Sequence, residues 1–259
     1  MSELQKKVIN DTAPVTLAEC VYMGDGTKNT IKDEITSIKN NTSNEQPSTT
    51  NRYRGKKALW LGDSISVVGS PTYPKLVCDT LGMTLNNKAS SGGNSLRMRQ
   101  ILQGLESYTA PSLTDIDFVF IMIGHNCDVS FANKDSIDSL PSHKDNTAYT
   151  DYTQGNFFCD IGSCVEYIRA KNSAIEIFFI TPIQGKYESS LRYDSTSKMA
   201  MEGLKELGIE YSIPVIDVYG ECGISNRNIS ADCYDDIHPN NTTGIPKIAN
   251  TIIRYLLCH

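Results

Sequence analysis

The chain has 259 residues, of which 39% are hydrophobic and 21% charged, and its formal net charge is -6. This length is enough for one large domain, or for one domain with an appendage. With a pI near 5.3, the chain lacks the basic character that phosphate binding requires, so we expect no nucleic-acid partner. No stretch approaches the ~18 apolar residues that cross a bilayer, and the polar N-terminus lacks the apolar core of a signal peptide. We therefore expect synthesis in the cytoplasm and no membrane partner.

The eight cysteines do not form paired Cys-x-x-Cys units, so no structural zinc site or other metal site is predicted. In a chain of this length they are expected to be reduced and partly buried. Cys222 and Cys233 bracket one segment and could form a disulfide in an oxidising compartment. Spacing alone leaves their state open.

Residues 1–51 differ in character from the rest and are expected to form an attachment or oligomerisation segment with a linker. An apolar stretch over residues 15–23 predicts a strand, and Gly24-Asp25-Gly26 predicts a turn. Residues 30–38 begin like an amphipathic helix that is too short to be stable alone in water. The polar stretch 40–51 predicts a linker. A loosely attached tail is the alternative interpretation.

From residue 52 onward, apolar runs of strand length alternate with segments of helical periodicity. The predicted strands span residues 58–61, 84–89, 117–123, 174–180 and 214–218. The predicted helices span residues 74–81, 95–105, 157–169 and 190–207, the last closed by Gly208, with a final helix from about Thr243. The long polar stretch 126–153 is predicted to be a loop. This alternation predicts a three-layer α/β domain with a parallel sheet, in which ligands bind at the carboxyl ends of the strands.

Four polar or glycine-rich motifs follow predicted strands: Gly62-Asp63-Ser64-Ile65, residues 89–95 (Ala-Ser-Ser-Gly-Gly-Asn-Ser), Gly124-His125-Asn126 and residues 235–240 (Asp-Asp-Ile-His-Pro-Asn). A serine hydroxyl is a poor nucleophile until a base removes its proton. A histidine can be that base, and a carboxylate on its other ring nitrogen fixes the tautomer. Ser64, His238 and Asp235 are the candidates for these roles. Backbone N–H groups and the Asn126 amide could stabilise the oxyanion.

The four motifs occur in the order found in SGNH hydrolases of the GDSL esterase family, and residues 56–259 resemble that family. The resemblance implies a flavodoxin-like sheet in a hydrolase domain over residues 52–259. It also implies that Ser64 is the nucleophile, His238 the general base and Asp235 the orienting acid, with no cofactor.

The same resemblance implies an oxyanion hole formed by the N–H groups of Ser64 and Gly93 and the side chain of Asn126. Spacing favours Gly93, but the doubled glycine leaves Gly92 open. The remaining candidate contacts with substrate are His125, Gly92 and Asn94, although a packing or hydrogen-bonding role is favoured for His125. The family's third motif usually continues with aspartate, whereas Cys127 stands here, so we expect altered local hydrogen bonding and retained activity.

The expected function is hydrolysis of short acyl esters, acetyl esters first, on a small molecule or polysaccharide. The segment Val-Tyr-Met-Gly-Asp-Gly-Thr at residues 21–27, with the short helix after it, is similar to N-terminal segments of phage tail-fibre and other virion proteins. A virion partner or a homo-oligomer formed through residues 1–51 is therefore predicted, with a host surface polysaccharide as substrate. The alternatives are a lysophospholipase or thioesterase acting on longer acyl chains, or a non-catalytic virion protein that binds glycans.

Overall fold

The computed structural model describes residues 21–22, 28–29, 51–127, 136–141, 148–185 and 196–259. The chain divides into two compact units, Met1–Thr50 and Asn51–His259. In the first unit, strand β1 (Val21–Tyr22) pairs antiparallel with β2 (Lys28–Asn29). The helix predicted over residues 30–38 lies outside the described residues, and the role given to residues 1–51 remains a prediction.

A parallel sheet forms the centre of the second unit. Its spatial order is β4 (Thr84–Asn87), β3 (Lys57–Gly62), β5 (Phe118–Met122), β6 (Glu176–Ile180) and β7 (Val215–Ile216). Every residue of β5 is buried, as expected of a strand covered on both faces. The strand order reverses at β3, because β4 lies on one side of it and all later strands lie on the other. Ligands bind at such switch points, at the carboxyl edge of the sheet.

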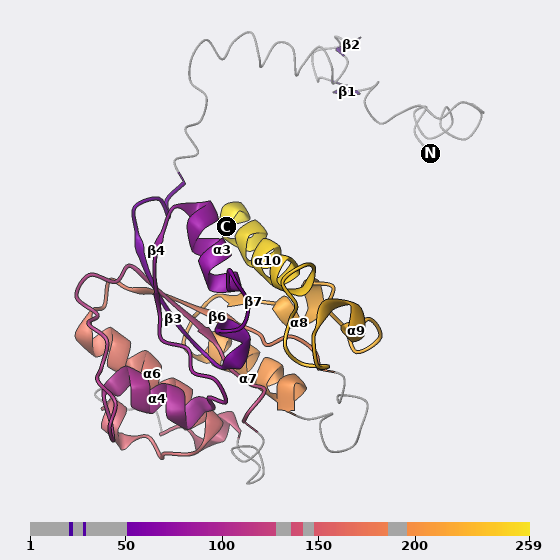
Figure 1. Ribbon diagram of the computed structural model, residues 1–259. Coiled ribbons are helices and arrows are strands. Elements are labelled where there is room, and N and C mark those ends of the chain that lie inside the picture. The colour runs from indigo at the N-terminus through magenta and orange to yellow at the C-terminus, as the bar shows by residue number, and fades with distance from the viewer. Residues whose placement is uncertain (1–20, 23–27, 30–50, 128–135, 142–147, 186–195) are drawn as a thin grey trace, which may run out of the picture. The chain divides into compact units, whose positions relative to one another are not determined.

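Helices cover both faces of the sheet, which confirms the predicted three-layer, flavodoxin-like α/β fold (Figure 1). The helices α3 (Tyr73–Leu81) and α10 (Gly244–Cys258) pack on one face, over Trp60 and Phe120 of the sheet. On the other face lie α4 (Ser95–Gln103), α6 (Phe157–Lys171) and α7 (Thr196–Glu210). Leu59 and Leu61 point to that second face, so β3 follows the period of two expected of a strand.

The predicted end of α7 was wrong. The helix continues through Gly208 to Glu210, and Gly208 is needed for packing instead of termination. A Cβ atom at Gly208 would lie only 2.3 Å from Cγ2 of Val215, so glycine lets the helix approach β7. Four short elements had not been predicted: η2 (Ile137–Ser139), η3 (Tyr149–Asp151), α8 (Val218–Glu221) and α9 (Ile229–Asp232).

The cysteines of the described residues are free thiols, and all of them except Cys258 are buried. Cys222 and Cys233 belong to the buried free thiols, so the structure contains no bond between these two. None of the helices in the described part of the chain is long and apolar enough to cross a bilayer.

Asp217 directly follows β7 and caps α8, and it provides a test of pH-dependent stability. Its carboxylate accepts a hydrogen bond from the N–H of Gly220 at 3.1 Å and lies 2.6 Å from the Lys205 ammonium. Partial burial raises the pKa of Asp217, but Lys205 and the donors around the carboxylate outweigh burial and hold the pKa below its ordinary value. The carboxylate therefore stabilises the fold above the unfolded-state pKa, and this contribution is lost as pH falls through the folded-state pKa.

Asp217→Asn is expected to lower the free energy of unfolding by ~1 kcal/mol at pH 7. The difference from wild type should shrink as the pH falls through the folded-state pKa of Asp217, because protonation then makes its side chain neutral, like that of asparagine. Urea unfolding at each pH measures the difference in unfolding free energy between the two proteins. A difference that stays the same at every pH would contradict the stabilising role given to the Asp217 carboxylate.

Candidate active site

Ser64 lies directly after β3, at the carboxyl edge of the sheet. It begins the single-turn helix η1 (Ser64–Ser66), whose N-cap is Asp63; Oδ1 of Asp63 accepts the N–H of Ile65 at 3.0 Å. The backbone packs so closely here that position 62 requires glycine: a Cβ atom at Gly62 would lie 2.6 Å from the carbonyl oxygen of Met122. Ser64 itself is 7% exposed, so its hydroxyl is held in a fixed, mostly covered position.

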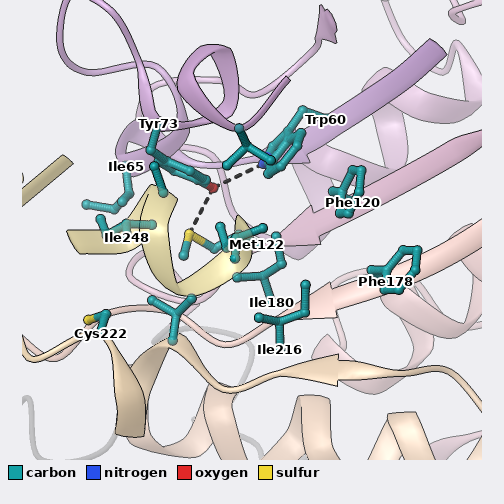
Figure 2. Close-up of a cluster of buried hydrophobic side chains, with 14 of the residues drawn as sticks. Trp60, Ile65, Tyr73, Phe120, Met122, Phe178, Ile180, Ile216, Cys222 and Ile248 are labelled. Atoms are coloured by element: carbon teal, nitrogen blue, oxygen red, sulfur yellow. Dashed lines mark hydrogen bonds between the residues drawn. The ribbon is translucent and has the colours of Figure 1, made fainter. Parts of the chain in front are cut away.

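Tyr73 lies beside this turn, and its hydroxyl points toward Trp60 and Met122 (Figure 2). Its buried hydroxyl accepts the indole N–H of Trp60 at 3.1 Å, donates to Sδ of Met122 at 3.0 Å and lies 2.7 Å from Oγ of Ser66. Three polar side-chain contacts of the buried region thus meet at one oxygen atom. The turn that carries Ser64 is therefore anchored to the core through the first residue of α3.

Tyr73→Phe should lower the free energy of unfolding by ~1–3 kcal/mol, because buried donors are left without an acceptor. Thermal or urea unfolding measures the change. The control is Tyr108→Phe, which removes a hydroxyl from a tyrosine that is 36% exposed and should change stability little. Equal effects of the two substitutions would contradict the role given to the buried hydroxyl.

The predicted base and acid meet the predicted nucleophile. Nε2 of His238 lies 2.9 Å from Oγ of Ser64, although 174 residues separate them. Nδ1 of His238 lies 2.8 Å from Oδ2 of Asp235, and the backbone N–H of His238 donates to Oδ1 of Asp235 at 2.8 Å. A carboxylate at Nδ1 favours the tautomer with the proton on Nδ1, which leaves Nε2 free to accept the serine proton.

The Asp235 carboxylate remains ionised in this arrangement. Slight burial raises its pKa, but the hydrogen bonds from the backbone and ring of His238 outweigh burial and hold the pKa below the ordinary value of an aspartate. The Asp235 side chain is 59% exposed and that of His238 is 31% exposed. Asp235 and His238 thus lie at the surface, whereas Ser64 is covered.

The candidate oxyanion donors also come together. The Asn126 amide donates to the carbonyl of Gly93 at 3.1 Å, which joins the second and third motifs. The N–H of Gly93 donates to the carbonyl of Ser90 at 2.9 Å and so closes a turn. Gly92 is exposed and has φ of +67°, and no acceptor among the described residues takes its N–H or that of Ser64. This geometry favours Gly92 over Gly93 as a donor to substrate.

Residues 60–243 match the model of the GDSL-like lipase/acylhydrolase family. The chain belongs to this family. No curated protein matches the sequence. The fold is shared with a lipase/acylhydrolase from Enterococcus faecalis, at 18% identity and a TM-score of 0.55, over 78% of this chain and 96% of that one. It is also shared with a catalytic mutant of an acetylxylan esterase from Geobacillus stearothermophilus, at 17% identity and a TM-score of 0.53, over 78% and 94%.

This member of the GDSL-like family holds the loop that carries Asp235 and His238 by contacts that sequence reasoning did not identify. The N–H of Tyr234 donates to the carbonyl of His238 at 2.8 Å, which closes the loop, and Asp236 has φ of +67°. Oδ1 of Asn240 accepts the N–H groups of Thr243 at 2.8 Å and of Gly244 at 3.2 Å. Asn240 therefore fixes the loop to the start of α10. An asparagine directly after His-Pro and before a helix was the available sequence signal.

Two candidate substrate contacts have structural roles in the family fold. Nδ1 of His125 lies 3.4 Å from Oγ of Ser197, and its Nε2 is buried without a partner among the described residues. Burial lowers the pKa of His125, against the attraction of the nearby Asp63 carboxylate, so the ring is neutral. Asn94 caps α4 by accepting the N–H of Arg97 at 2.9 Å. Contact of either residue with substrate remains a prediction.

Proposed function

We propose that this acylhydrolase is a serine esterase that removes short acyl groups, acetyl in particular, from carbohydrate. The observation that carries the proposal is the continuous hydrogen-bonded line from Ser64 Oγ through His238 to Asp235. An ordinary serine has no base within reach, whereas this hydroxyl has an imidazole nitrogen that can accept its proton.

The chemistry runs through an acyl-enzyme. Ser64 Oγ attacks the ester carbonyl while its proton moves to Nε2 of His238, and the oxyanion is stabilised by backbone N–H groups and the second amide hydrogen of Asn126. The intermediate then expels the alkoxide, which takes the proton from His238. Water, deprotonated by His238, next attacks the acyl group on Ser64 and releases the carboxylic acid and free serine. Asp235 orients the ring throughout and stabilises the imidazolium.

A short acyl group fits the described surroundings of the triad. Acyl chains of lipid length require an extended apolar surface. In the described residues the large exposed hydrophobic side chains are few: Tyr108, Ile209, Tyr234 and Leu257. Only Tyr234 belongs to the loop that carries the acid and base. The acetylxylan esterase with the same fold supports carbohydrate as the alcohol part.

The substrate class is tested with the purified chain and four substrates: p-nitrophenyl acetate, p-nitrophenyl octanoate, acetyl-coenzyme A and acetylated xylan. The proposal expects higher kcat/KM for acetate than for octanoate, and acetic acid release from the acetylated polysaccharide. Faster turnover of octanoate, or of the thioester, would favour a lysophospholipase or thioesterase instead. Ser64→Ala is the blank for every substrate, and an unchanged rate would indicate a non-catalytic protein.

We further propose that residues 1–51 attach the enzyme to a virion or to other copies of itself, which would direct it to a host surface polysaccharide. The support is the sequence pattern of residues 21–38 alone. Native mass measured with and without residues 1–51 tests the oligomeric form of the proposal. A monomer in both cases would overturn self-association through this segment.

A further inference from the structure

A buried ion pair lies between α4 and α6, and the reaction steps described above do not use it. The side chains of Arg99 and Asp160 are 3% and 0% exposed, and Nη1 of Arg99 lies 3.4 Å from Oδ1 of Asp160. The same guanidinium donates to the carbonyl groups of Tyr152 at 3.0 Å and Thr153 at 3.3 Å. Removing two charges from water is costly, and well-packed apolar residues would often be at least as stable. A positioning role would explain why the pair lies here.

The pair is joined to the oxyanion side of the active site by one hydroxyl group. Ser95 is fully buried and follows Gly92, Gly93 and Asn94 directly. Its Oγ donates to Oδ2 of Asp160 at 3.1 Å. Burial raises the pKa of Asp160 to about 6, against the pull of its hydrogen-bond donors and Arg99, so the carboxylate is ionised at neutral pH and can accept this bond.

Ser95 also contacts the third motif. The Cys127 thiol lies within hydrogen-bonding reach of the backbone N–H and side chain of Ser95. Burial raises the pKa of Cys127, so the thiol keeps its proton and can donate it. Cys127 is the neighbour of Asn126, whose amide bonds to Gly93. Ser95 therefore lies where the turn with the two glycines meets the loop with the oxyanion asparagine.

We propose that Ser95 and Asp160 are positioning residues for the oxyanion hole, which they hold by tying the Gly92–Gly93 turn and the Cys127 end of the Asn126 loop to α6. The inference rests on the proposed esterase function. Arg99 holds the Asp160 carboxylate at Oδ1, and Oδ2 of the same carboxylate holds the Ser95 hydroxyl. A carboxylate on α6 thus reaches the third motif through Ser95 and Cys127.

Oxyanion stabilisation depends steeply on geometry, because the donors must already point to where charge develops. Ser95→Ala removes the link and keeps the buried ion pair. We expect kcat for p-nitrophenyl acetate to fall ~10–100-fold with KM changed less than ~3-fold, since the lost interaction acts mainly in the transition state. Inactivation by phenylmethylsulfonyl fluoride, which also passes through an oxyanion, should slow in parallel.

The matched control is Ser163→Ala. This serine is also fully buried between α4 and α6, where its Oγ donates to the carbonyl of Tyr149 at 2.6 Å and accepts from Gln103 at 2.8 Å. Among the described residues, the Ser163 side chain forms no hydrogen bond to the Gly92–Gly93 turn or to the loop of Asn126. Its loss should lower Tm about as much as Ser95→Ala does and leave kcat within ~2-fold. Both variants are assayed at the same interval below their own Tm.

A kcat for Ser95→Ala within twofold of wild type, or an equal fall for Ser163→Ala, would overturn the inference. Asp160→Asn is a second variant, and if it folds, its kcat loss should not add to that of Ser95→Ala, because both substitutions break one connection. Additive losses would likewise overturn the inference. Full activity of Ser64→Ala is a different result, because it would remove the proposed function itself.

Discussion

Replacing Ser64 by alanine is expected to lower kcat for p-nitrophenyl acetate by ~10⁴–10⁶-fold, while the oxyanion donors sustain a small residual rate. The reason is that the attacking atom is lost, and with it the acyl-enzyme route. Ser64 is 7% exposed and makes its side-chain contact with His238 at the edge of the fold, so the smaller side chain should leave the core intact. Initial rates and circular dichroism on the same preparation measure both effects.

The control is the other serine of the turn. Ser66 is fully buried, and its hydroxyl contacts Tyr73 instead of His238. Ser66→Ala should therefore cost stability more than rate. A fluorophosphonate probe followed by peptide mass analysis should label Ser64 in wild type and in Ser66→Ala. Label on Ser66, or a Ser64→Ala variant within tenfold of wild type, would contradict the assignment.

The sequence was sufficient for the sheet and for the meeting of Ser64, His238 and Asp235, because both depend on local signals joined by topology. The run Phe118–Met122 is apolar throughout and has to be a buried strand, and the carboxyl ends of parallel strands meet at one edge. Motifs that follow β3 and the final strand could therefore be expected to meet, as Ser64 and His238 do. The length of the intervening chain does not matter to this argument.

Details set by packing could not be predicted in the same way. Gly208 suggested a helix end, but glycine is required there because Val215 of β7 packs closely against α7. The local sequence does not reveal such a contact between a helix and a strand. The choice between Gly92 and Gly93 depends on which N–H closes the turn with Ser90, and spacing alone does not contain that information. The bond from Ser95 to Asp160 joins residues 65 positions apart with no motif to mark it.

Replacing Asp235, the proposed orienting acid, is expected to cause the second large loss of activity. The solvent exposure of Asp235 determines how far kcat should fall. Asp235→Asn should reduce kcat by ~10²–10³-fold, less than the ~10⁴ typical of a buried orienting aspartate. An amide N–H facing Nδ1 favours the wrong tautomer, but the Asp235 side chain is 59% exposed, so water already screens its charge. Because its pKa lies below the ordinary 3.8, protonation of this carboxylate should not limit activity near neutral pH.

Asp236→Asn is a matched control for charge on the same loop. Asp236 has φ of +67°, a conformation that asparagine also adopts readily, so the backbone should be preserved. We expect this variant to keep kcat within ~3-fold of wild type, because the ring nitrogen is hydrogen-bonded to Asp235. Equal losses in both variants would mean that the loop's net charge matters more than the contact. A loss below tenfold for Asp235→Asn would mean that the backbone contacts of His238 alone orient its ring, and the carboxylate would then not be needed to set the tautomer.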